Sequence, residues 1–227
     1  MPAWQFVNSK TIGTNRGPGN RGDVIAFLNP VLDQVPDQQP KVLDVGCNTA
    51  WLAHVFVNYF GIDSDSNSIH VAQNFWERES RWTQDEVKKR IREVSPAEEW
   101  PTDFNDFDGI ILRDVLEHVP DSSRLFKLAV ARLKPEGWIF ISAPDAQRWM
   151  WNDPTHVRPL PLQAQKWLAQ LVGAELIHQG YESVAPGTQK IAKLFNERSP
   201  VFIRLLSRFR WWPRNCLSLI RLPSETP

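Results

Sequence analysis

The chain has 227 residues, 42% of them hydrophobic, and a formal net charge of zero, so it is long enough to bury one sizeable core. A neutral total argues against a dedicated nucleic-acid binder, although residues 186–227 contain eight Lys and Arg against two Asp and Glu. The two cysteines are too few for a disulfide scaffold and favour a reducing cytoplasm. Because no signal-peptide pattern and no transmembrane run is visible, we expect one cytoplasmic domain over residues 1–227.

The first third of the chain predicts a flexible segment followed by a β-turn-α-β unit. Residues 1–22 are polar and rich in glycine, which is typical of a flexible lid. An apolar run over about 41–46, a helical pattern over about 50–57 and a second apolar run over about 58–62 follow. The second run ends beside Asp63, and a carboxylate at a strand tip of an open α/β sheet suits the hydroxyl groups of a ribose. The unit therefore predicts a nucleoside-bearing cofactor.

The rest of the chain alternates between helical and strand patterns. Helices are expected from Ser66 or Asn67 onward, through the charged residues 77–100, from about 120 to Leu133, and over about 162–172. Strands are expected at about 91–94, 106–112, 138–143 and 174–181, and residues 134–137 (Lys-Pro-Glu-Gly) predict a helix stop and turn. This alternation predicts a doubly wound, Rossmann-like α/β sheet with helices on both faces.

A family resemblance rests on four ordered segments. The turn at residues 46–50 lacks the second and third glycines of a dinucleotide-binding turn, so a pyrophosphate site is poorly supported. The chain resembles instead a class I S-adenosylmethionine-dependent methyltransferase of the small bacterial type. The segments that match this family in order and spacing are residues 42–47, 60–63, 107–120 and 133–144, within an expected cofactor-binding core at 41–145.

The resemblance implies a fold, a cofactor and a set of cofactor-binding residues. The sheet is expected to have seven strands, with the last one, at 215–222, antiparallel. The cofactor is expected to be S-adenosyl-L-methionine and the product S-adenosyl-L-homocysteine. The implied contacts are Asp44, Gly46, Cys47 and Asn48 beneath the methionine part, Asp63 and Ser64 at the ribose, and Leu112, Arg113, Asp114 and Glu117 on the methionine and acceptor side. Alternatively, Asp63 only caps the next helix, although Asp65 is the better candidate for that cap.

The chain departs from the family pattern in two places. Asn48 stands where the family usually has glycine, and Ala50 where it has glycine or another small residue. Asn tolerates left-handed backbone angles and Ala is small, so the turn can keep its shape. Ser95 and Pro96 stand where the family often has an acid that contacts adenine. These departures motivate a rival hypothesis, in which the chain is a binding or regulatory protein with a methyltransferase fold and no transfer activity.

Residues 146–161 are expected to form a loop over the acceptor side of the site. The acceptor-side residues are Trp151, Asp153 and Arg158, and the candidate general base is His156. Imidazole titrates near neutral pH, and methyl transfer requires an acceptor that is deprotonated or already neutral. The alternative is that Asp153, His156 and Arg158 form a network that only fixes the loop.

His118 is the second candidate catalytic residue. It follows Glu117, and the alternative for this pair is a solvated first turn of the next helix. No metal is expected, because the scattered His, Asp and Cys residues show no ligand spacing.

The segment 186–214 before the last strand is expected to be a basic, aromatic insertion. Within it, residues 199–214 predict a short helix with two apolar stripes. Three interpretations remain open: a lid over the acceptor, packing against the core or a second subunit, and weak contact with a membrane surface.

Together these features predict a methyltransferase that acts on a small-molecule or glycan-type acceptor by O- or N-methylation. The strand at 106–112 ends in Leu112-Arg-Asp114, without the proline-aromatic signature of enzymes that methylate amino groups of nucleic acids and proteins, so no nucleic-acid partner is expected. The chain is expected to be a monomer or a homodimer.

Overall fold

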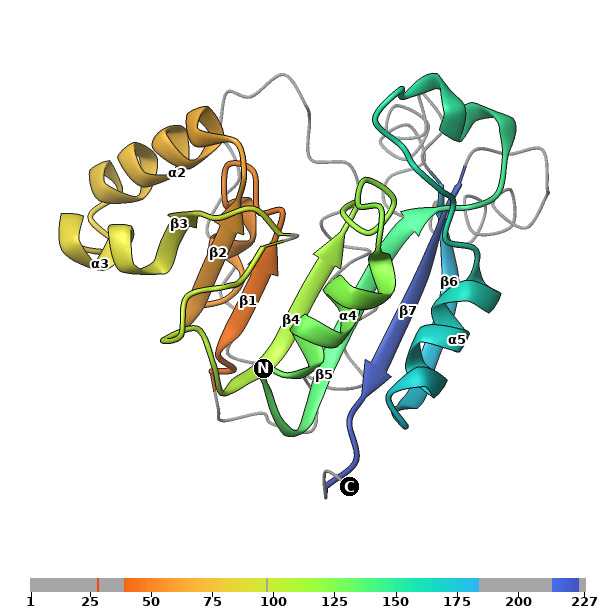
Figure 1. The fold of residues 1–227 in the computed structure, drawn as a ribbon. Coiled ribbons are helices and arrows are strands. Elements are labelled where there is room, and N and C mark those ends of the chain that lie inside the picture. The colour runs from red at the N-terminus through yellow and green to blue at the C-terminus, as the bar shows by residue number, and fades with distance from the viewer. Residues whose placement is uncertain (1–27, 29–38, 97, 184–213, 225–227) are drawn as a thin grey trace, which may run out of the picture.

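The computed structural model describes residue 28, residues 39–96 and 98–183, and residues 214–224. The predicted lid at 1–22 and nearly all of the predicted insertion at 186–214 lie outside the described residues. The described ranges form one sheet with helices packed against it (Figure 1).

The sheet has seven strands in the order β3-β2-β1-β4-β5-β7-β6. Their bounds are β1 Val42–Val45, β2 Tyr59–Asp63, β3 Ile91–Glu93, β4 Phe107–Arg113, β5 Leu133–Pro144, β6 Glu175–Ser183 and β7 Arg214–Arg221. Strands β1 to β5 pair in parallel, whereas β7 lies antiparallel to both β5 and β6. The predicted Rossmann-like sheet with an antiparallel last strand is therefore confirmed.

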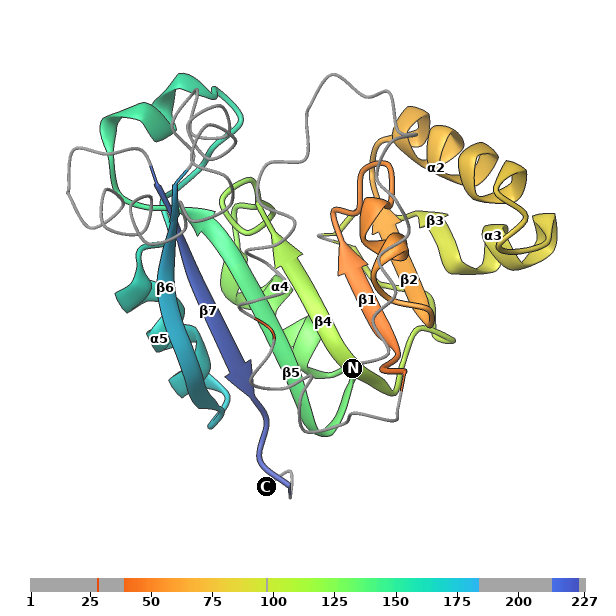
Figure 2. The same ribbon diagram turned by 180° about the vertical axis from the view of Figure 1, so that it is seen from behind.

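Helices cover both faces of this sheet. They are η1 Trp51–His54, α2 Ser66–Arg78, α3 Gln84–Arg90, α4 Ser122–Val130, η2 Arg148–Asn152 and α5 Leu162–Leu171, where η marks a 3₁₀-helix. α4 and α5 lie in front of the sheet in Figure 1, and the view from behind in Figure 2 shows the opposite face. Among the described residues, no helix combines the length and apolar character needed to cross a membrane.

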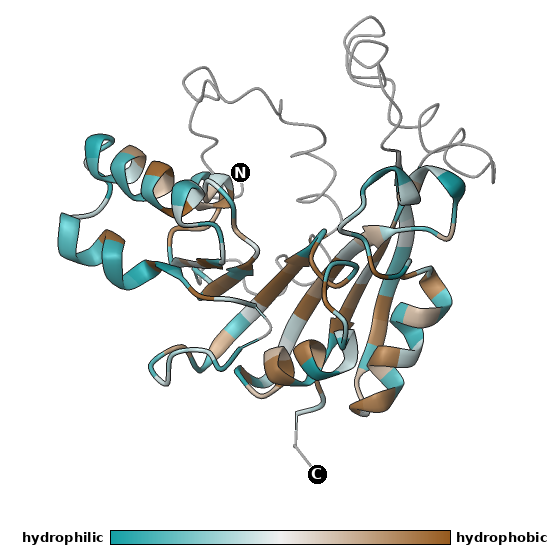
Figure 3. Ribbon diagram, turned by 45° about the horizontal axis from the view of Figure 1, so that its top comes forward, coloured by the Kyte–Doolittle hydropathy of each residue, from teal (hydrophilic) through white to brown (hydrophobic). Residues whose placement is uncertain are grey.

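Two hydrophobic layers, one on each face of the sheet, hold the helices in place. Neighbouring strand residues point to opposite faces, so Val42 belongs to one layer and Leu43 to the other. The first layer includes Trp76 of α2, and the second includes Phe126 of α4 and Leu168 of α5. Figure 3 shows hydrophobic residues along the central strands and a largely hydrophilic α3.

Local hydrogen bonds set where two helices begin. The helix expected from Ser66 or Asn67 onward is α2, which begins at Ser66, and its cap is Asp65, whose carboxylate accepts hydrogen bonds from the backbone N–H groups of Asn67 and Ser68. The charged segment 77–100 is not one continuous helix, because Thr83 starts α3 anew with a reciprocal capping box to Glu86.

Three further predicted elements are shorter or differently placed than the sequence pattern suggests. The helix expected at 50–57 is a single 3₁₀ turn, η1. The helix expected to reach Leu133 ends at Val130, because Leu133 already pairs with Phe107 in the sheet. Residues 134–137, expected as a turn, lie within the bounds of β5, but they are skipped by the pairing with β4, which resumes at Trp138.

Gly46 sets how closely β1 and β4 approach at their carboxyl ends. It has a positive φ of 73°, a conformation that L side chains rarely adopt. A Cβ atom added there would lie 2.5 Å from Cγ2 of Val115, in the loop after β4. The turn after β1 therefore touches the loop after β4 only because position 46 has no side chain.

We expect Gly46→Ala to lower the free energy of unfolding by about 2–4 kcal/mol, from left-handed strain and overpacking together. The matched control is Gly173→Ala, which has φ 65° but nothing within 4 Å of the added Cβ atom, so its loss is limited to about 1 kcal/mol of backbone strain. Urea unfolding of both variants measures the difference. Equal losses would show that the contact with Val115 is unimportant.

Candidate active site

The strand order reverses between β1 and β4, and the candidate site lies at the carboxyl ends of these two strands. β1 pairs with β2 on one side and with β4 on the other, so the connections after β1 and β4 leave the sheet in opposite directions. Such a switch point is where open α/β sheets bind ligands. The turn at 46–50 and the loop at 114–121 are brought together here, although more than sixty residues separate them.

The turn after β1 keeps its shape without the glycines of the family pattern. Asn48 and Ala50 have φ of 48° and 55°, in the left-handed region. Asn48 accepts a hydrogen bond through Oδ1 from the backbone N–H of Thr49, at 2.8 Å, which supports this conformation. Its own backbone N–H donates to Oδ2 of Asp63, at 2.7 Å. The turn is therefore tied to the tip of β2.

Asp63 lies at the tip of β2, as predicted for a ribose-binding carboxylate. Its Oδ2 accepts from Asn48, and its Oδ1 accepts from the backbone N–H of Asp65 at 2.9 Å. A carboxylate has about four lone-pair sites, so two backbone donors leave it able to accept further hydrogen bonds. Asp65, not Asp63, caps α2, and Ser64 between them is exposed.

Two predicted cofactor residues direct their side chains into the protein interior. The thiol of Cys47 is buried, and a Cβ atom on Gly61 would lie 2.9 Å from its Sγ. Leu112 is fully buried in the second hydrophobic layer. Only the backbone of these two residues is placed to face a ligand at the sheet edge.

Arg113 and Asp114 are held by residues of the last strands. The guanidinium of Arg113 lies 3.6 Å from Oε1 of the buried Glu182 in β6 and 5.6 Å from the ring centre of Trp51. Asp114 accepts a 2.7 Å hydrogen bond from the side-chain amide of Asn215 in β7. Neither Glu182 nor Asn215 is recognisable from sequence, because their place beside Arg113 and Asp114 depends on the pairing of β7 with its neighbours.

Asp44 is a buried carboxyl group, only 4% exposed. Its Oδ2 accepts a hydrogen bond from the hydroxyl of Tyr59, at 2.9 Å. Loss of hydration on burial raises the pKa of Asp44 to about 7, although the hydrogen bond and the charge of Arg113 act in the opposite direction. Asp44 therefore changes its protonation state near neutral pH.

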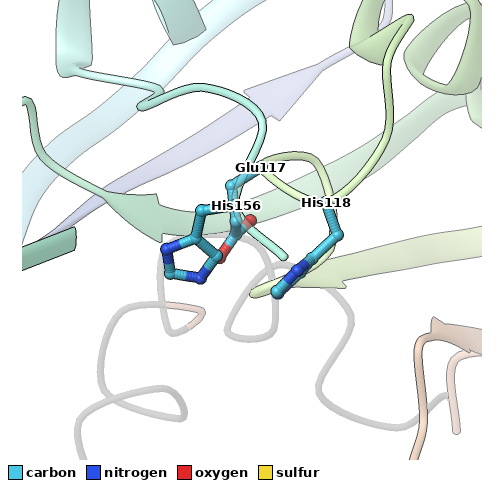
Figure 4. A group of neighbouring side chains, drawn as sticks. All are labelled: Glu117, His118 and His156. Atoms are coloured by element: carbon cyan, nitrogen blue, oxygen red, sulfur yellow. The ribbon is translucent and has the colours of Figure 1, made fainter. Parts of the chain in front are cut away.

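The predicted acceptor side comprises two loops, one after β4 and the other between β5 and α5. Figure 4 shows Glu117 and His118 on the first loop and His156 on the second. The loops are joined through the backbone N–H of Val157, which donates to the carbonyl of Glu117 at 2.7 Å. The guanidinium of Arg158 also donates to the carbonyl of Pro120.

Both imidazoles are oriented through their Nδ1 atoms. Nδ1 of His156 lies 2.7 Å from the carbonyl oxygen of Met150, which can only accept, so this nitrogen carries the proton. Nδ1 of His118 lies 2.9 Å from Oγ1 of Thr155. That hydroxyl donates its hydrogen to Asp153, at 2.6 Å, and so accepts from His118. This assignment, made from the partners, leaves the Nε2 atom of each neutral ring with a free lone pair.

Glu117 is fully buried, so the alternative of a solvated helical turn is wrong for this residue. Burial raises its pKa to about 9, and the negative charges of Asp114 and Asp153 act in the same direction. Among the described residues, neither oxygen of its carboxyl group has a hydrogen-bond partner. One oxygen of this carboxyl group, one ring nitrogen of His118 and one ring nitrogen of His156 all lie within 4.8 Å of one another.

The structure also describes the surroundings of the remaining acceptor-side candidates. Trp151 is 57% exposed, as a side chain available to an acceptor would be. Asp153 accepts from the backbone N–H and the hydroxyl of Thr155, and its Oδ2 lies 3.8 Å from Nε2 of His156. Asp153 and Arg158 therefore fix the loop, and His156 keeps one nitrogen available for chemistry.

We expect the buried Asp44 to make stability fall as the pH rises. The folded state keeps the proton up to a pKa of about 7, whereas the unfolded carboxyl loses it near 3.8. Between these values the unfolded state is increasingly favoured. Asp44→Asn removes this titration, so the difference in unfolding free energy (variant minus wild type) should grow by about 3 kcal/mol from pH 5 to pH 8. Urea unfolding at several pH values measures it, and a constant difference would contradict the assignment.

Comparison with known proteins agrees with this geometry. A family model described as a methyltransferase domain matches residues 20–179. The chain is 29% identical over 163 residues to a ubiquinone biosynthesis O-methyltransferase of Paracidovorax citrulli, covering 70% of this chain and 58% of that protein. It is 30% identical over 134 residues to the protein of the same name from Coxiella burnetii, covering 55% and 54%. The chain thus spans little more than half the length of these two relatives.

A solved structure shares the fold at much lower identity. It is the N-methyltransferase NodS from Bradyrhizobium japonicum, in complex with S-adenosyl-L-homocysteine. Its TM-score is 0.61 at 16% identity, with 96% of this chain and 94% of that chain covered. The family model matches well over half of the present chain. The strand order, the switch point and the order of the residues at the strand ends are those expected for a methyltransferase of this type. The chain belongs to the class I S-adenosylmethionine-dependent methyltransferases.

Proposed function

We propose that this protein transfers the methyl group of S-adenosylmethionine to a hydroxyl oxygen of a small organic acceptor. The observation that carries the proposal is the pair of imidazoles, His118 and His156, with free Nε2 atoms beside the carboxyl ends of β4 and β5. A hydroxyl group must lose its proton to become a good nucleophile, and a neutral imidazole can accept it. The names of the relatives from P. citrulli and C. burnetii also support O-methylation.

The residues on the donor side fit the cofactor. Asp63 keeps acceptor capacity at the tip of β2, and the turn at 46–50 presents backbone without bulky side chains beside it. When bound, the cofactor supplies a methyl group on a sulfonium sulfur, which in-line attack by the acceptor oxygen transfers, with the carbon–sulfur electron pair returning to sulfur. The chain's own contribution is to hold the acceptor and to take its proton.

On the acceptor side, His156 is the residue in position to take the proton. Its Nδ1–H is fixed on the carbonyl of Met150, so Nε2 faces away from that anchor. Asp153 lies 3.8 Å from Nε2 and stabilises the imidazolium that forms. The acceptor class, a small molecule or a glycan-type metabolite, belongs to this proposal as well.

Calorimetric titration with S-adenosylmethionine and S-adenosylhomocysteine tests the donor side. We expect both to bind, and we expect Asp63→Asn to weaken both by about tenfold or more, because a charged acceptor of the ribose hydroxyls is lost. Asp85→Asn, which removes an exposed carboxylate from the first turn of α3, is the matched control. If neither compound bound the wild-type protein, the rival hypothesis of a non-catalytic protein, which Asn48 and Ala50 motivated, would be favoured.

A second measurement tests the acceptor side. We expect His156→Ala to lower turnover by about 10²-fold or more, while the affinity for S-adenosylmethionine stays within about twofold of wild type. His70→Ala, at an exposed position in α2, should leave both quantities unchanged. Unchanged turnover in His156→Ala would exclude a chemical role for this residue and leave only its role in fixing the loop.

A further inference from the structure

The acceptor side contains more than a single base requires, because a buried carboxyl group lies against the two imidazoles. We propose that Glu117, His118 and His156 bind a divalent transition-metal ion. The binding site itself is independent of the proposed function. The catalytic role of the ion does rest on that function. In that role the bound ion, instead of His156, would activate the acceptor hydroxyl.

The three ligand atoms are close enough to share one ion after a small contraction. All of them lie within 4.8 Å of one another. Bonds of about 2.0–2.1 Å to Zn²⁺ place the ligand atoms at most about 4.2 Å apart. The hydrogen bond from Val157 to Glu117 already holds the two loops together. Small rotations of the side chains about their χ angles are therefore enough to shorten the distances between the three atoms to this value.

The imidazoles are arranged as metal ligands are. In most metal sites a ligating histidine donates its other ring N–H to a carbonyl, a carboxylate or another fixed acceptor. His156 donates to the carbonyl of Met150, and His118 donates to the hydroxyl of Thr155, which is held in turn by Asp153. Both Nε2 lone pairs are thereby presented by rings whose orientation is fixed.

Glu117 supplies the independent observation that points to a cation. Its side chain is fully buried, and within the described part of the chain neither carboxyl oxygen meets a hydrogen-bond donor. A buried polar group without a partner is costly, by about 1–3 kcal/mol. A cation between the two Nε2 atoms and this carboxylate would compensate all three groups at once. The carboxylates of Asp114 and Asp153 nearby add to the negative potential.

The donor set defines the chemical class of the ion. Two imidazole nitrogens and one carboxylate are a ligand set of catalytic zinc sites and of ferrous sites with open positions. Mg²⁺ and Ca²⁺ prefer oxygen ligands throughout. Three protein ligands leave room for an oxygen-bearing acceptor, and a bound divalent ion lowers the pKa of a hydroxyl that it contacts, so that the proton is released to solvent.

Metal binding is measured directly on the full chain, purified without a histidine tag and stripped with a chelator. Zn²⁺ is titrated in competition with a chromophoric chelator, and Co²⁺ is added separately to record its visible absorption. We expect one Zn²⁺ per chain and a Co²⁺ spectrum typical of nitrogen and oxygen ligands. Glu117→Gln and His118→Ala should each weaken Zn²⁺ binding by about tenfold or more, whereas His70→Ala should bind as the wild type does. Circular dichroism and urea unfolding of the variants show whether they fold.

The outcomes separate this proposal from the proposed function. Absence of Zn²⁺ and Co²⁺ binding, or binding that Glu117→Gln and His118→Ala leave unchanged in folded protein, would overturn the metal site. Methyl transfer that continues after chelation would overturn the catalytic role of the ion and leave the proposed function standing. Zn²⁺ bound at Glu117 and the imidazoles, with no transfer to any hydroxyl acceptor, would support the site and reject the proposed function.

Discussion

The structure depends on the parallel pairing of β1 with β4. Val42 to Val45 pair with Gly109 to Leu112, although about sixty residues of chain lie between them, and this pairing ends both strands at the same edge. The close contact of Gly46 with Val115 follows from it, since the two connections then begin next to each other before they diverge. Donor-side and acceptor-side residues can meet only because this central pair is formed.

Buried carboxyl groups are the main electrostatic cost of this arrangement. Asp44 and Glu117 are both buried, and both have a raised pKa. Asp44 has the hydroxyl of Tyr59 as a partner, whereas the carboxyl oxygens of Glu117 have none among the described residues. Stability alone does not favour such groups, and acids with perturbed pKa values are concentrated at functional sites. Their position at the ends of β1 and after β4 indicates that function maintains them.

The sequence predicted the sheet better than the helices, for a physical reason. Buried parallel strands are continuous apolar runs, and five of the six strand ranges that patterns predicted correspond closely to observed strands. The exception is β5, which extends back to Leu133 because a strand can resume its pairing after skipped residues. Helix boundaries depend on single capping contacts, such as the capping box of Thr83 and Glu86, which apolar periodicity does not encode. The position and direction of the last strand were expected from the family resemblance.

Some residues of the candidate site are recognisable from sequence, whereas their grouping in space is not. Asp63 is recognisable because it follows an apolar run directly, and the structure places it at the strand tip. The grouping of Glu117 and His118 with His156 is not recognisable, because the ligand atoms come from two loops and their separation in sequence follows no helical or strand period. For that reason sequence spacing does not indicate a metal, although each of the three residues is a candidate site residue individually.

The two halves of the site differ in how completely the protein satisfies its own polar groups. On the donor half, Asp63 accepts two backbone hydrogen bonds and Asn48 supports its own turn, so this half is formed before any ligand binds. On the acceptor half, the imidazoles are anchored at Nδ1, and a ring nitrogen of each lies within 4.8 Å of a carboxyl oxygen of Glu117, which has no hydrogen-bond partner among the described residues. Such a half is completed only by something that binds there.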